Sequence, residues 1–114
     1  MIGERRADSI FRKCQYTMTR LVGRNSTFPI NQQIQFKVSC LVWMLKQKYI
    51  GEESPRYITK KEYNKDLEQI SMLESKITDG AFKADAVQTV ADAREYLDII
   101  ARHKVRQTNS TRVY

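Results

Sequence analysis

Residues 31–51 read NQQIQFKVSCLVWMLKQKYIG, and their apolar side chains fall on two sides of one helix. The first stripe recurs every three or four residues and consists of Ile34, Val38, Leu41, Leu45 and Tyr49. The second stripe consists of Phe36, Cys40, Trp43 and Ile50. This pattern predicts a helix over residues 32–50, with Asn31 as its N-cap and Gly51 closing its end. Because a helix of this kind is usually buried by neighbours on several sides, we expect it at the centre of the fold.

The segment before this central helix carries a single apolar stripe. Its members are spaced for one helix face over residues 8–23 and are Ile10, Phe11, Cys14, Met18, Leu21 and Val22. Gly23 can supply the left-handed cap at the end of this helix. The polar residues that follow, up to Pro29, predict a loop between the first and second helices.

The segment after the central helix begins with the clearest local signal in the chain. Thr59 and Glu62 fit the capping box, in which a threonine and a glutamate three residues apart satisfy the first N–H groups of a helix. The helix predicted from this signal covers residues 60–77, and its buried face consists of Tyr63, Leu67, Ile70, Leu73 and Ile77. Its opposite face alternates bases with acids, Asp66 and Glu68 among them, and is expected to be solvated.

A fourth stripe covers residues 80–104 and consists of Phe82, Ala86, Val90, Ala93, Leu97 and Ile100. Asp79, in the short link before it, is the expected N-cap, and so short a link predicts an antiparallel helical hairpin. With only 4 Gly and 2 Pro in 114 residues, the chain favours long regular elements. We predict an all-α protein, a compact bundle of about four helices with a helical hairpin at the C-terminal half and no sheet. Residues 1–106 form the single helical domain, and residues 107–114 form a flexible C-terminal tail.

Charge is segregated along the chain. The net charge of +7 divides into +7 over residues 1–51, −4 over residues 52–101 and +4 over residues 102–114, and no acid lies between Asp8 and Glu52. Such asymmetry favours a polyanionic partner. No apolar run approaches the roughly 20 residues that cross a bilayer, and no secretory signal is present, so we expect a cytoplasmic protein without a membrane span.

Residues for catalysis or metal binding are sparse. The only histidine, His103, lies between Arg102 and Lys104, and this neighbourhood opposes both its protonation and metal coordination. Cys14 and Cys40 lie on apolar helix faces and are expected to be reduced core thiols. The sequence contains no Gly-rich phosphate loop or nucleophile motif. We therefore expect no enzyme activity, no metal and no cofactor.

The basic residues are the one positive functional signal. The first hypothesis is a non-enzymatic nucleic-acid-binding accessory protein, in which a basic helical face contacts the phosphate backbone of DNA or RNA. Arginine suits this role because its guanidinium binds phosphate bidentately and stacks on bases. The expected contact residues are Arg5, Arg6, Arg12, Lys13, Arg20, Arg24, Arg102, Lys104 and Arg106.

The alternative is a protein-interaction module, either a subunit or an inhibitor, whose basic face docks on an acidic protein partner. The second stripe of the central helix supports it, because Phe36, Trp43 and Ile50 can face a partner or another copy of the chain in a homo-oligomer. The two hypotheses require different surfaces. A nucleic-acid binder needs its arginines on one continuous exposed face, whereas a docking protein needs an exposed apolar patch ringed by charge.

Overall fold

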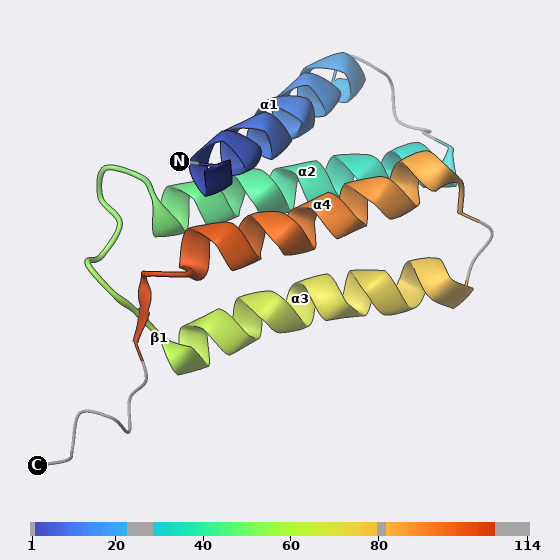
Figure 1. Ribbon diagram of the computed structural model, residues 1–114. Coiled ribbons are helices and arrows are strands. Elements are labelled where there is room, and N and C mark those ends of the chain that lie inside the picture. The colour runs from blue at the N-terminus through green and yellow to red at the C-terminus, as the bar shows by residue number, and fades with distance from the viewer. Residues whose placement is uncertain (1, 23–28, 80–81, 107–114) are drawn as a thin grey trace, which may run out of the picture.

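The computed structural model describes residues 2–22, 29–79 and 82–106. Within these ranges the chain forms four helices and two very short strands, in the order α1 (Ile2–Val22), α2 (Ile30–Tyr49), β1 (Ile58–Thr59), α3 (Lys60–Asp79), α4 (Ala84–Ala101) and β2 (Val105–Arg106). Figure 1 shows the helices lying side by side along one direction, with α4 between α2 and α3. The predicted helical bundle and its C-terminal hairpin of α3 and α4 are confirmed.

The central helix is α4, whereas the sequence placed α2 there. Helix α4 packs against all three other helices, while the main packing partners of α2 are α1 and α4. Small residues explain this position: Ala86, Ala93 and Ala101 are buried on α4 and let neighbouring helices approach closely. None of the helices in the described part of the chain is long and apolar enough to cross a membrane.

The core contains most of the predicted apolar faces. Every member of the first α2 stripe is buried, as are Ile10, Phe11, Cys14 and Leu21 of α1 and Val90, Ala93 and Leu97 of α4. The predicted face of α3 is less complete, because Ile70 and Leu73 are buried while Tyr63, Leu67 and Ile77 are only partly covered. Helix α3 therefore lies at the edge of a three-helix core.

Both ends of α2 show how local contacts set its limits. Asn31 does not cap it, because Pro29 occupies the N-cap position and its carbonyl accepts from the N–H of Gln33 at 3.0 Å. The side-chain oxygen of Asn31 instead accepts from the N–H of Lys83 at 2.7 Å and ties the start of α2 to the start of α4. At the other end, a Cβ atom on Gly51 would lie 2.5 Å from the carbonyl oxygen of Gln47. The predicted closing role of Gly51 thus has a steric basis.

Helix α3 begins where the capping signal predicts. The N–H of Glu62 donates to Oγ1 of Thr59 at 3.1 Å, while the carboxylate of Glu62 pairs with Lys48 of α2. The cap residue Thr59 and Ile58 before it pair in parallel with Arg106 and Val105. The prediction of no sheet is wrong for these four residues, because the segment that enters α3 runs beside the segment that leaves α4 and the two exchange backbone hydrogen bonds.

The limits of the hairpin helices differ from the predicted ones. Asp79 belongs to α3, and the N-cap of α4 is Lys83, so the predicted capping role of Asp79 is wrong. Helix α4 ends at Ala101, because the chain then turns into β2. Gly23, Arg24 and the predicted flexible tail at residues 107–114 lie outside the described residues.

Candidate partner-binding groove

Two residues of the predicted basic face of α1, Arg6 and Lys13, pair with carboxylates of α4. The Arg6 guanidinium lies 2.9 Å from Glu95 and 3.2 Å from Asp92, and the Lys13 ammonium lies 3.1 Å from Asp92. Asp92 is buried and also accepts from Gln88 at 2.8 Å. A hydrogen bond and the nearby charge of Glu95 raise the pKa of Arg6. We call this set of contacts the α1–α4 seam.

The other predicted phosphate contacts lie in two parts of the chain, with Arg5, Arg12 and Arg20 exposed on α1 and Arg102, Lys104 and Arg106 after the end of α4. Arg12 pairs with Asp8, and Arg102 pairs with Asp98 as its i, i+4 spacing predicts. Lys104 donates to the Ser54 hydroxyl at 3.1 Å, and the Arg106 guanidinium lies 4.0 Å from the centre of the Tyr57 ring. Within the described residues, the predicted contacts that remain exposed without an ion pair are Arg5, Arg20 and Arg106.

Helices α2 and α3 meet at one end through a polar cluster, which we call the α2–α3 clamp. The Lys48 ammonium lies 3.0 Å from carboxylate oxygens of both Asp66 and Glu62, and the Tyr49 hydroxyl donates to Asp66 at 2.7 Å. Burial opposes the charge of Lys48, but the two carboxylates outweigh it and raise its pKa; Lys48 in turn lowers the pKa of Glu62. Asp66, predicted on the solvated face of α3, is buried in this contact.

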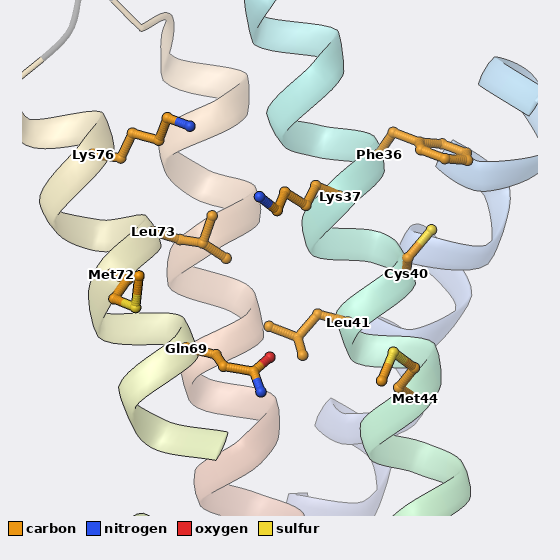
Figure 2. Close-up of a pocket in the computed structure, with 9 residues that line it drawn as sticks. All are labelled: Phe36, Lys37, Cys40, Leu41, Met44, Gln69, Met72, Leu73 and Lys76. Atoms are coloured by element: carbon orange, nitrogen blue, oxygen red, sulfur yellow. The ribbon is translucent and has the colours of Figure 1, made fainter. Parts of the chain in front are cut away.

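Beyond the clamp an apolar groove of about 660 Å³ runs between α2 and α3. Leu41 and Leu73 are buried at its base and point toward each other from the two helices (Figure 2). Met44 of α2 and Met72 of α3 border it and are 61% and 67% exposed. The lining of α2 spans positions 36 to 44, which corresponds to about 12 Å of helix, or a little over two turns.

Two lysines stand at the end of the groove that is farther from the clamp. Lys37 projects from α2 and Lys76 from α3, and both side chains point toward the space between the helices (Figure 2). Within the described part of the chain neither ammonium forms an ion pair, although Arg6, Lys13 and Lys48 all do so at helix contacts. The groove therefore combines an apolar floor with unneutralised positive charge at one end.

The three predicted interface residues fall in different places. Phe36 borders the groove but points away from α3 in Figure 2. Trp43 stacks on Phe11 of α1, with ring centroids 5.6 Å apart. Ile50 is exposed and lines a separate hollow of about 500 Å³ between the N-terminal end of α1 and the C-terminal ends of α2 and α4.

The groove residues that sequence reasoning missed are Lys37, Met44, Gln69, Met72 and Lys76. Met72 lies off the predicted apolar face of α3, and Met44 falls between the two stripes of α2. Helical spacing shows which face of a helix is apolar, but it does not show that α2 and α3 stay apart. The one feature of the sequence that could have indicated the groove was a methionine outside an apolar stripe.

Among residues 2–22, 29–79 and 82–106, no group of three or more His, Cys, Asp or Glu side chains is placed to hold a metal ion. Burial raises the pKa of the Cys14 thiol to about 11 and also raises that of Cys40, so both thiols are poor nucleophiles at neutral pH. His103 is exposed and borders the same hollow as Ile50.

Comparison of the chain with protein-family models, curated proteins and solved structures finds no match.

Proposed function

We propose that the protein is a non-enzymatic protein-interaction module that docks an apolar segment of a partner protein in the α2–α3 groove. The observation that carries this proposal is the pair of exposed methionines, Met44 and Met72, above a leucine floor. Large apolar side chains gathered in a concave, solvent-open site favour association, because covering them removes apolar area from water. Methionine suits such a role, since its flexible thioether adapts to different partner side chains.

Nucleic-acid binding is the second candidate, and the net charge of +7 favours it. Part of this positive charge is already neutralised by carboxylates of the protein itself. Arg6 and Lys13 neutralise Asp92 and Glu95 in the α1–α4 seam, and each of Arg12 and Arg102 pairs with an acid four residues earlier in the chain. A phosphate would have to compete with these carboxylates. The apolar groove has no such internal competitor, and it is the basis for ranking protein docking first.

The test uses a fluorescent helical peptide with leucines at positions i, i+3, i+4 and i+7 and only glutamine and alanine elsewhere. Fluorescence anisotropy should show saturable binding to the wild-type protein. Met72→Glu should weaken it at least tenfold, because a carboxylate would then stand in the apolar contact. Tyr16→Glu on α1 is the matched control, since Tyr16 is equally exposed at 69% and lies outside the groove; it should leave binding unchanged.

The second candidate has a separate outcome. Electrophoretic shifts with DNA and RNA at two salt concentrations would favour it if affinity falls steeply with salt and Arg5→Gln with Arg20→Gln weakens binding. The docking proposal would be overturned if the protein binds no peptide and if Met72→Glu leaves its nucleic-acid binding unchanged.

A further inference from the structure

We infer that the occupant of the α2–α3 groove is an acidic amphipathic helix, whose apolar stripe lies on Leu41 and Leu73 and whose carboxylates meet Lys37 and Lys76. This inference rests on the proposed docking function and adds the chemistry of the partner. It makes the two groove lysines the determinants of specificity.

The shape of the groove fits a helix. Two antiparallel helices joined at the clamp leave a trough between them, and a third helix can lay one apolar face into such a trough. The available length of about 12 Å matches two to three turns of the incoming segment, with three or four apolar residues on one face. The two methionines would then flank the apolar stripe from either side.

The charge of the groove selects the sign of the partner. Lys37 and Lys76 approach from opposite walls, and covering the groove with a neutral or basic segment would partly desolvate both ammonium groups without a counter-charge. Carboxylates on both sides of the apolar stripe, placed at one end of the segment, would neutralise them. The other end of the groove meets Gln69 and then the clamp, where Glu62 and Asp66 already neutralise Lys48.

A second copy of the chain is a poorer occupant. It would bring another +7 of net charge toward the two lysines. The segment at residues 107–114 is a poor candidate on composition, because it contains Arg112 and no acid. An acidic segment of another protein meets both the apolar and the charge requirement.

The experiment compares three peptides that share the leucine stripe of the neutral probe. One carries glutamates on both sides of the stripe at one end, one carries glutamines there and one carries lysines. The glutamate peptide should bind at least fivefold more tightly than the glutamine peptide at low salt, and the difference should shrink at 0.5 M NaCl. The lysine peptide should bind most weakly.

Substitutions on the protein locate the effect. Lys37→Gln and Lys76→Gln should each weaken the glutamate peptide about two- to fivefold and leave the glutamine peptide almost unchanged. Lys61→Gln and Lys65→Gln, exposed lysines of α3 outside the groove, are matched controls and should have no effect. The double variant K37E/K76E should reverse the order and favour the lysine peptide.

The outcomes separate the inference from the proposed function. Equal affinity for the glutamate and glutamine peptides, with Met72→Glu still disruptive, would overturn the acidic selection and leave docking intact. Binding of dodecanoate with no affinity for any peptide would overturn both in favour of a fatty-acid site. A concentration-dependent dimer that Met72→Glu dissociates would identify a second copy as the occupant and overturn the inference.

Discussion

Lysine or arginine side chains lie between helices in both the α1–α4 seam and the α2–α3 groove. The two regions differ in whether carboxylates neutralise these side chains. In the seam, Arg6 and Lys13 of α1 meet the carboxylates of α4 and the helices close. In the groove, Lys37 and Lys76 face each other without a carboxylate within the described residues, and the helices stay apart except at the clamp. In the seam the cations are neutralised by carboxylates of α4, whereas α2 and α3 both pack on α4, which lies between them (Figure 1), and meet each other at the clamp.

The largest effect should come from the apolar core behind the seam. Leu97 of α4 is fully buried, so Leu97→Ala removes apolar contacts and leaves a cavity. We expect a loss of about 3 kcal/mol in the free energy of unfolding, measured by urea denaturation. A loss below about 1 kcal/mol would mean that the core of α1, α2 and α4 is loosely packed.

The polar part of the seam should contribute less. Asp92→Ala removes a buried acceptor that serves Arg6, Lys13 and Gln88, and we expect a loss of about 2 kcal/mol. This loss of unfolding free energy is smaller than that for a fully buried ion pair, because Arg6 and Lys13 are partly exposed and regain water. Glu74→Ala is the control, since its pair with Arg94 is exposed and should be worth less than about 1 kcal/mol. Equal losses for the two variants would contradict this view of the seam.

Alkaline pH should lower the free energy of unfolding through Cys14, a buried thiol of α1. Burial raises the pKa of Cys14 to about 11, above its unfolded value of about 9. The unfolded thiol therefore loses its proton first, so stability is full below about pH 9 and falls as the pH rises toward 11, by roughly 2 kcal/mol. Cys14→Ala should reduce this slope. It should not remove it, because burial also raises the pKa of Tyr49 and Tyr96. An unchanged slope would mean that the Cys14 thiol is solvated.

The position of α3, which forms one wall of the groove, depends on the cap at the start of this helix. Thr59→Ala removes the acceptor for the N–H of Glu62 and should cost about 1 kcal/mol, measured by thermal or urea unfolding. Thr78→Ala near the end of α3 is the control, because Thr78 donates only to a carbonyl of its own helix. If Thr59→Ala leaves the melting temperature unchanged, the cap does not hold α3 in place.

The sequence predicted the parts of the fold that depend on one helix at a time. Spacing alone identified the buried face of α2 and the buried Leu97, and the Thr59 signal located the start of α3. Spacing failed for charged residues, because Asp66 and Asp92 are buried where a cation of another helix reaches them, and this depends on how the helices pack. The groove was missed for the same reason, since the convergence of Lys37 and Lys76 depends on how α2 and α3 pack.

The smallest effect on stability should come from the groove. Met72→Ala should change the free energy of unfolding by less than about 0.5 kcal/mol, because its side chain is already 67% exposed and gains little from folding. Affinity for the leucine-faced peptide should nevertheless fall severalfold, since the same side chain becomes buried on docking. Urea denaturation and anisotropy on one preparation separate the two effects. Such a separation marks a residue placed for binding, whereas a loss of stability comparable to that of Leu97→Ala would show that Met72 belongs to the core and that the groove closes in solution.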